Sequence, residues 1–380
     1  MANGIKAGRR GFMKAAGAGA LLSVPMINLG YYRLGASDRT YSARSVAIVE
    51  RAMVLDMLAI PKIDFRPEVP ARPMTDREKA EFRASGITGI QNAVGIGGPR
   101  AKEQALEFLA AWQGYAGRNS DVFSLVGLVS DLERAKAEGK VGMIMGLQNA
   151  DQFERATDVK FFYDLGLRCA QLTYNSLNRI GSGATERVDA GVSDFGVSII
   201  GAMNDVGMLI DVSHSGDRTT LDAVELSPRP IVFTHSNCRA LNEHPRNKTD
   251  EMIVKLAAKG GVMGITGVRN FISNRDPTTI VDYVDHIEHV VKLVGIEHVG
   301  IGSDSDLNGY DDMPADQNAM LRNAYKDSYA FRDKIDVDGF DHPRKVFDLV
   351  EEMIRRGYSD DSIELVLGGN FARLLRATWK

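Results

Sequence analysis

Short apolar runs alternate with amphipathic segments along most of the chain, beginning near residue 45. Eight runs have the continuous apolar character of buried strands: 53–58, 86–94, 141–147, 168–174, 208–212, 230–234, 261–266 and 298–302. Between them, helical periodicity marks seven segments: 101–118, 129–137, 155–164, 195–205, 216–226, 249–258 and 279–294. Buried strands separated by helices indicate a parallel sheet covered by helices. Eight of them favour a closed α/β barrel of the TIM, or (β/α)8, type over residues 45–380.

Two segments depart from this alternation. Residues 308–341 are long and polar, which predicts a lid-like insertion in the barrel. Residues 1–36 contain the pair Arg9 and Arg10, followed by an apolar run over 15–29. Paired arginines before an apolar stretch are typical of a twin-arginine export signal. The run is shorter than the roughly 20 residues that span a bilayer.

We therefore expect the twin-arginine export machinery as a partner and a periplasmic or exported protein. An uncleaved signal would leave the protein tethered to the membrane. The alternative for this segment is a basic amphipathic helix packed on the barrel.

The amino-acid composition further narrows the class of protein. Of 380 residues, 44% are hydrophobic and 25% are charged, as in ordinary soluble domains. A net charge of −4 argues against nucleic-acid binding. Two cysteines, Cys169 and Cys238, cannot form a disulfide framework, although one bridge between them stays open. All seven histidines lie at or after His214, so histidine chemistry belongs to the second half of the chain.

Three of the expected strands are followed by groups that bind metals or transfer protons. His214 follows the run 208–212, His235 follows 230–234, and Asp304 follows 298–302. The loops after barrel strands meet at one mouth, so we expect these three side chains there. Two imidazoles and a carboxylate form a reasonable zinc ligand set.

Several motifs in order carry a family resemblance. They are Leu172-Thr-Tyr-Asn175, Gly191-Val-Ser-Asp-Phe-Gly196, Asp211-Val-Ser-His214, Phe233-Thr-His235, His244-Pro-Arg-Asn247, Ile301-Gly-Ser-Asp304 and Gly368-Gly-Asn-Phe371. Together they resemble the membrane (renal-type) dipeptidase family, peptidase M19, over residues 45–380 and most densely after residue 165. The resemblance implies a TIM-like barrel of the metal-dependent hydrolase type. Its usual members cleave dipeptides with two zinc ions and a bridging hydroxide.

The resemblance also implies roles for particular residues. His214 and His235 match the two imidazoles of one zinc. Asp304 matches the aspartate that orients or deprotonates the attacking water, and it is a further candidate ligand. Arg246 matches the arginine that holds the substrate's carboxylate, a task suited to a guanidinium. Tyr174 stands where the family has a histidine that contacts the reacting carbonyl; it either donates a hydrogen bond there or only fills the space.

The first half of the chain departs from the family pattern at the metal. Leu58 and Ile60 occupy the positions of a histidine and an aspartate that bind the other zinc. Gln148 occupies the position of the bridging glutamate, and an amide is a poorer bridge than a carboxylate. No histidine precedes His214, so no shift of the alignment restores the ligand. The resemblance therefore predicts a divergent member with one zinc or none.

Two hypotheses about function follow. The first is a metal-dependent dipeptidase or amidohydrolase that cleaves a dipeptide-like amide with one zinc. The second is a non-peptidase periplasmic protein on the same scaffold, which binds a ligand or tailors an exported peptide-like metabolite. The substrate and the oligomeric state, possible homodimers included, stay open.

Overall fold

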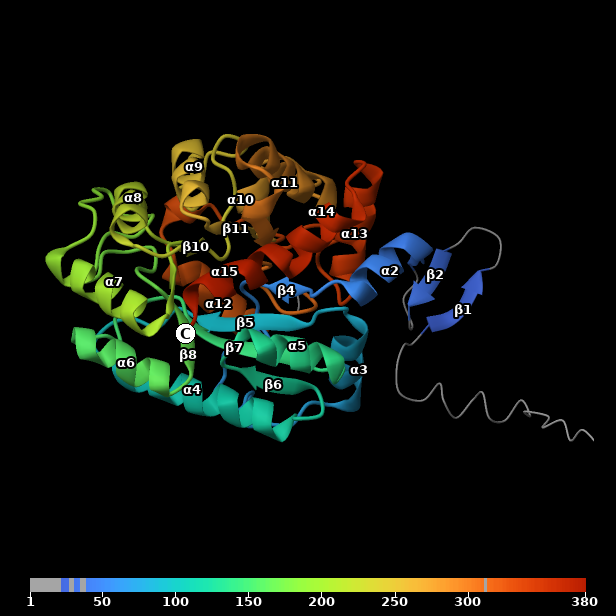
Figure 1. Ribbon diagram of the computed structural model, residues 1–380, viewed down its shortest axis with the longest axis horizontal. Helices are drawn as coiled ribbons and strands as arrows, with labels where there is room; N and C mark the ends of the chain where they lie inside the picture. The colour runs from blue at the N-terminus through green and yellow to red at the C-terminus, as the bar shows by residue number, and fades with distance from the viewer. Residues whose placement is uncertain (1–21, 27–30, 35–38, 311–312) are drawn as a thin grey trace, which may run out of the picture.

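Eight parallel strands close into a barrel in the computed structural model, which describes residues 22–26, 31–34, 39–310 and 313–380 (Figure 1). The strands are β4 (Leu55–Asp56), β5 (Gly89–Val94), β7 (Val141–Leu147), β8 (Leu167–Gln171), β9 (Leu209–Asp211), β10 (Val232–Phe233), β11 (Val262–Ile265) and β12 (Val299–Ile301). They neighbour one another in the order β5-β4-β12-β11-β10-β9-β8-β7, and pairing of β5 with β7 closes the ring. The predicted (β/α)8 fold is confirmed.

Helices surround the strands, and their ends follow local signals in the sequence. The seven predicted helices are α4 (Ala101–Arg118), α5 (Val129–Ala137), α6 (Ala156–Asp164), α7 (Asp194–Val206), α8 (Asp217–Leu226), α9 (Asp250–Ala258) and α11 (Ile280–Val294). Ser193 caps the start of α7, and Gly207 ends it in the left-handed conformation that glycine adopts without strain. Thr249 and Thr279 cap α9 and α11 in the same way as Ser193.

The C-terminal helix closes one end of the barrel. Phe371, Leu374 and Leu375 of α15 (Asn370–Thr378) pack against the first residues of several strands, among them Leu55 and Leu209. These contacts bury apolar surface at the amino-terminal ends of the strands. The carboxyl-terminal ends therefore form the open mouth, where the polar residues that follow the strands gather.

Some elements were not predicted. The strand β6 (Phe123–Val126) pairs with the first half of β7, outside the closed ring. Helices α2 (Ala43–Arg51), α3 (Asp76–Ala84), α13 (Lys345–Arg355) and α14 (Asp360–Glu364) add to the outer layer. Cys169 and Cys238 are buried free thiols, so the structure contains no bridge between them.

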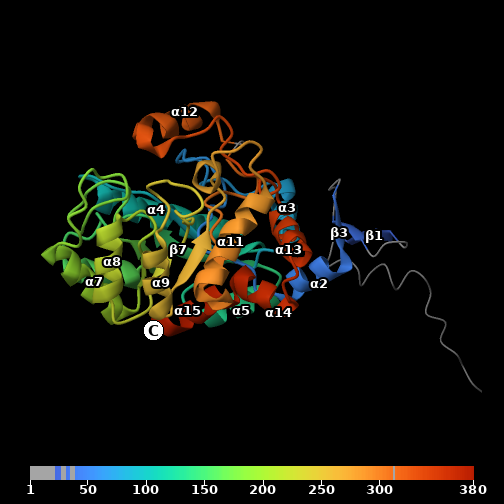
Figure 2. The ribbon, with the colours of Figure 1, turned by 90° about the horizontal axis from the view of Figure 1, so that it is seen from above.

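The polar segment 308–341 contributes α12 (Ala315–Ala324) and the turn Asp327–Tyr329. Figure 2 shows α12 beyond the barrel mouth, at the end opposite α15. Tyr329 and Ile335 anchor the segment by packing on Val268 and Phe271, next to and within the short helix α10 (Arg269–Ile272). The segment therefore supplies one wall of the space above the strands.

Near the N-terminus, β1 (Leu22–Met26), β2 (Tyr31–Leu34) and β3 (Thr40–Ser42) form a three-stranded antiparallel sheet. Arg9, Arg10 and most of the predicted export signal over 1–36 lie outside the described residues. The helices in the described ranges are too short or too polar for any of them to traverse a bilayer. Export therefore stays a prediction.

Candidate active site at the barrel mouth

Two histidines face each other at the ends of neighbouring strands. His214 follows β9 and His235 follows β10, and their Nε2 atoms lie 2.8 Å apart. Both side chains are buried, with 1% and 0% of their surface exposed. The structure therefore brings together the two imidazoles that the sequence predicted at one mouth.

Hydrogen bonds on the far side of each ring set its tautomer. His214 donates from Nδ1 to the side-chain oxygen of Asn175 at 2.7 Å. The Thr234 hydroxyl gives its only proton to Asp211 at 2.6 Å, so it accepts the Nδ1–H of His235 at 2.8 Å. Both Nε2 atoms consequently carry lone pairs. Two lone pairs pointed at one another need a proton or a cation between them.

The surroundings oppose a proton in that position. Burial lowers the pKa of both histidines well below the usual range, and the positive charges of Arg246 and Lys248 act in the same direction. Burial raises the pKa of Asp211 behind the pair, and four hydrogen bonds to its carboxylate, from the N–H and hydroxyl groups of Ser213 and Thr234, oppose that rise. The pair is thus a neutral donor set for a metal cation.

Tyr174 separates the histidines from the space above them. Its ring stacks on His214 with the centroids 4.2 Å apart and the planes 20° from parallel. Its hydroxyl is hydrogen-bonded to the hydroxyl of Tyr325 in the insertion. Burial raises the pKa of Tyr174 to about 12, so the phenol stays protonated and can donate a hydrogen bond.

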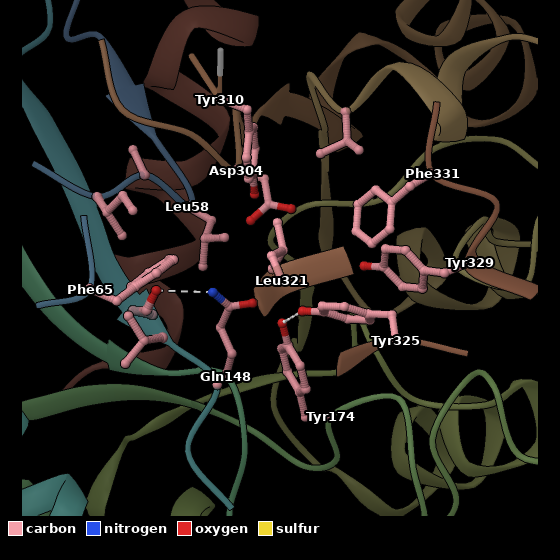
Figure 3. Close-up of a pocket in the computed structure, with 16 residues that line it drawn as sticks. Leu58, Phe65, Gln148, Tyr174, Asp304, Tyr310, Leu321, Tyr325, Tyr329 and Phe331 are labelled. Carbon is pink, nitrogen blue, oxygen red and sulfur yellow. Dashed lines mark hydrogen bonds between the residues drawn. The ribbon is translucent and has the colours of Figure 1, made fainter. Parts of the chain in front are cut away.

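A pocket of about 70 Å³ lies on the other side of Tyr174 (Figure 3). It brings together five residues that the sequence analysis singled out: Leu58, Ile60, Gln148, Tyr174 and Asp304. Five further aromatic residues line the pocket, all but Phe65 from the insertion: Phe65, Tyr310, Tyr325, Tyr329 and Phe331. His214 and His235 do not line this pocket.

Asp304 directs its carboxylate into the pocket (Figure 3). Its backbone has a φ of 59°, a left-handed conformation that aspartate tolerates better than most residues, and its N–H donates to Leu58 at 2.8 Å. Burial raises the pKa of Asp304 to about 7; the anions Asp56 and Asp211 also raise it, and Arg246 lowers it. Asp304 therefore has the pKa expected of an acid–base catalyst near neutral pH.

Arg246 lies behind the pocket wall and is fully buried. Its guanidinium donates to the backbone carbonyls of Ser213 and His235 and lies 5.4 Å from the ring centroid of Phe271. Its Nε has no hydrogen-bond partner within the described part of the chain. In this structure Arg246 braces the loops that carry the histidines, and its role in binding a substrate carboxylate stays a prediction.

Comparison with known proteins agrees with this geometry. The family profile described as "Membrane dipeptidase (Peptidase family M19)" matches residues 55–321. The chain belongs to the membrane dipeptidase family.

Relatives within and near the family support this assignment. The chain is 31% identical to "Dipeptidase verJ" of Clonostachys rogersoniana over 261 residues, 68% of this chain and 61% of that one. It is 37% identical to an uncharacterized dipeptidase of Schizosaccharomyces pombe over 175 residues, 44% of this chain and 42% of that one. The matches therefore span less than two thirds of these curated relatives. The crystal structure of an amidohydrolase from Pseudomonas aeruginosa, 30% identical, superposes with a TM-score of 0.77 over 88% of this chain and 99% of that chain.

The two-metal centre that the membrane dipeptidase family implies does not fit these residues. Leu58 and Ile60 present only hydrocarbon, and Gln148 uses its side-chain N–H to hydrogen-bond Ala93 at 2.9 Å. Among the described residues, no group of three or more His, Cys, Asp or Glu side chains is placed to hold a metal. Asp304 is not grouped with the histidine pair in this structure, and the three-ligand set of His214, His235 and Asp304 stays a prediction. His214 and His235 alone fit one cation.

Several residues of the site were not assigned a role from the sequence. Asn175, Asp211 and Thr234 orient the two histidines, and only their place inside the family motifs could have signalled it. The aromatic wall was missed because it comes from a segment that is polar on average. Its tyrosines and Phe331 recur within 310–331, and that recurrence is a signal that could have been used.

Proposed function

We propose that the protein hydrolyses an amide bond of a peptide-like substrate, with one zinc ion at His214 and His235 and Asp304 as the acid–base group. The observation that carries the proposal is the pair of facing Nε2 lone pairs beside a pocket that contains a single carboxylate, that of Asp304. Membership of the membrane dipeptidase family supports zinc as the metal and amide hydrolysis as the reaction.

Each group of the site has a separate role in the proposed reaction. When bound at the histidines, zinc would supply Lewis acidity, which polarises a carbonyl and makes water more acidic, once the Tyr174 ring that covers His214 has moved aside. Asp304 takes a proton from the attacking water as the new C–O bond forms. It returns that proton to the amine nitrogen as the C–N bond breaks. Tyr174 donates a hydrogen bond to the negative charge that develops on the carbonyl oxygen.

A second candidate, a non-peptidase that binds or tailors a peptide-like metabolite, is favoured by one observation. The positions of three family metal ligands carry Leu58, Ile60 and Gln148, and all three line the same pocket. A site so altered has room for an apolar group where the family has charge. The two candidates share the scaffold and differ in whether an amide bond is broken.

We further propose that the twin-arginine signal exports the protein to the periplasm. The support is the Arg9–Arg10 pair with the apolar run that follows. Twin-arginine export moves folded proteins, which suits a closed barrel of this size.

Metal analysis and turnover of the purified full-length protein test the first candidate. We expect one zinc per chain and release of free amine from dipeptides. His214→Ala should lose the metal and at least a hundredfold in activity, whereas Asp304→Asn should lose activity and keep the metal. His289→Ala, at an outer helix where the imidazole pairs with Asp250, is the matched control and should change neither quantity.

Two results would contradict the proposal. Two tightly bound zinc ions per chain would show that the site is not a one-zinc site. No turnover of any dipeptide with zinc, manganese or cobalt, together with an unaltered His214→Ala variant, would leave the non-peptidase candidate.

A further inference from the structure

A groove of about 890 Å³ opens directly from the pocket. Seven residues line both spaces, so the two are continuous: Ile60, Phe65, Val94, Gly95, Tyr174, Leu321 and Tyr325. The pocket itself holds only about 70 Å³. That is less than the roughly 150 Å³ of a cavity that accepts benzene, whereas grooves of about 300–1,000 Å³ hold drug-sized molecules. The pocket can take only the end of a ligand, and the groove has space for much more.

One face each of two helices forms the walls of the groove. From α4, Phe108 and Trp112 line it together with Gln104 and Ala111, at the three- and four-residue spacing of one helix face. From α12, the groove is lined by Gln317, Met320, Leu321 and Ala324, at the same spacing. In Figure 2, α12 lies beyond the mouth, whereas α4 belongs to the helices around the barrel.

Apolar side chains are presented openly along this groove. Met320 is 66% exposed and Phe65 is 49% exposed, although both are large hydrophobic residues. Exposed apolar side chains that gather along a concave surface are typical of ligand-binding sites.

The charges along the groove are neutralised within the protein. Five charged side chains line it, and each has an ion-pair partner: Lys62 with Glu78, Asp64 with Arg66, Glu107 with Arg100, and Lys326 with Glu186. An occupant therefore meets no uncompensated charge from these groups. The groove suits a molecule that is uncharged along its length and carries apolar side groups.

The backbone of the groove offers hydrogen bonds to a chain. Gly95, Ile96 and Gly97 continue from the end of β5 along the groove, where Gly95 lies against the ring of Tyr174. Across the described ranges, the backbone N–H and C=O groups of these three residues have no hydrogen-bond partner. Successive open N–H and C=O groups recognise the repeating amides of an extended peptide.

We propose that the substrate is a peptide-like chain of more than two residues, uncharged and apolar along its length, which lies in this groove with one end in the pocket. The inference rests on the proposed function for what happens at that end. An extended dipeptide spans only about 7 Å. A groove of about 890 Å³ is in the size range that holds drug-sized molecules, so it has room for a longer chain than that.

Binding rather than turnover tests this inference. Trp112 and Trp379 are the two tryptophans of the chain, so Trp379→Phe leaves Trp112 in the groove as the only tryptophan, which can be excited selectively over tyrosine. Asp304→Asn in the same protein prevents hydrolysis during the titration. The probes are the dipeptide Ala-Ala and two neutral pentapeptides, Ala-Ala-Leu-Phe-Leu and Leu-Phe-Leu-Ala-Ala, which extend it at either end.

At least one pentapeptide should bind with a Kd at least tenfold below that of Ala-Ala and change the Trp112 emission. Ala111→Phe, which fills the groove from α4, should weaken that pentapeptide at least tenfold and alter Ala-Ala less than twofold. Ala110→Phe is the matched control, because Ala110 is the next residue on the same helix but does not line the groove. If Ala111→Phe does not fold, Ala324→Phe and its control Ala319→Phe make the same comparison on α12.

The inference is overturned if neither pentapeptide binds more tightly than Ala-Ala, or if the groove variant and its control behave alike. These outcomes are independent of the proposed hydrolysis. Tight pentapeptide binding by a protein that cleaves no amide would refute the proposed function and leave the groove assignment standing. Efficient dipeptide cleavage without any pentapeptide preference would do the reverse.

Discussion

Two histidines outside the candidate site are built into the fold as neutral groups, so each should make the protein less stable as the pH falls. His286 accepts the backbone N–H of Cys238 at Nδ1, at 3.0 Å, and donates from Nε2 to the carbonyl of Ile272, at 3.0 Å. His244 is arranged in the same way between the N–H of Arg246 and the carbonyl of Tyr329. Neither imidazole can take a proton at Nδ1 without losing the bond to that backbone N–H.

The magnitude follows from the pKa values. Burial is the main cause that lowers the pKa of each of these two histidines from 6.5 to about 4. In the unfolded chain they take up protons near pH 6.5, whereas in the folded state they resist until about pH 4. Each of these two histidines therefore lowers the stability of the fold as the pH drops through this window. At 1.36 kcal/mol per pKa unit, each histidine removes about 3 kcal/mol, a large part of a total of about 5–15 kcal/mol.

Urea unfolding followed by far-UV circular dichroism, at steps from pH 7.5 to pH 4.5, measures this loss. In His286→Gln the amide can accept from Cys238 and donate to Ile272 but does not titrate. The variant should therefore lose about 2–3 kcal/mol less than wild type over the same range. His289→Gln, on the same helix as His286, is the control and should follow wild type. An unchanged pH dependence in His286→Gln would refute the reasoning.

Three further predictions concern the site and the export of the protein. Thr234→Val removes the hydroxyl between Asp211 and His235, and should weaken zinc binding about 10- to 100-fold in a chelator competition titration. Unchanged zinc affinity would mean that Thr234 does not orient the ring. Tyr174→Phe keeps the ring that stacks on His214 but removes the hydroxyl; kcat should fall at least tenfold while the thermal midpoint moves by only a few degrees. An equal kcat would assign Tyr174 a purely packing role. Replacing Arg9 and Arg10 together by lysine should leave the protein in the cytoplasmic fraction of a Gram-negative host, and continued export would exclude the twin-arginine route.

The barrel could be predicted because its signals are local. Continuous apolar runs such as 141–147 mark strands buried on both faces, and the segments 101–118 and 129–137 agree with α4 and α5 at both ends. The strand β6 was missed because its four residues, with Leu125 44% exposed, resemble a loop. An edge strand has only one neighbour, so burial leaves a weak pattern in its sequence.

The site could be predicted in part. The positions of His214, His235 and Asp304 follow from strand ends, and the loss of ligands at Leu58, Ile60 and Gln148 follows from the family pattern. No local sequence pattern gives the distance between two residues that lie far apart in the chain. Whether Asp304 reaches the histidine pair depends on how the ring of Tyr174 is placed between the pair and the pocket, and that is a property of packing across the barrel.

The stacking of Tyr174 on His214 also has a kinetic consequence. Tyr174 covers His214 on the pocket side, so a cation that passes between the pocket and the histidine pair must wait until the phenol ring swings aside and its bond to Tyr325 opens. Exchange would then be slow, and its rate would be that of a conformational opening rather than of diffusion. A metal ion that is bound during folding would stay bound when the protein is later moved to another compartment or buffer. The metal found in the purified protein would thus depend on the compartment in which the chain folded. The metal content is therefore best determined on protein made in more than one compartment.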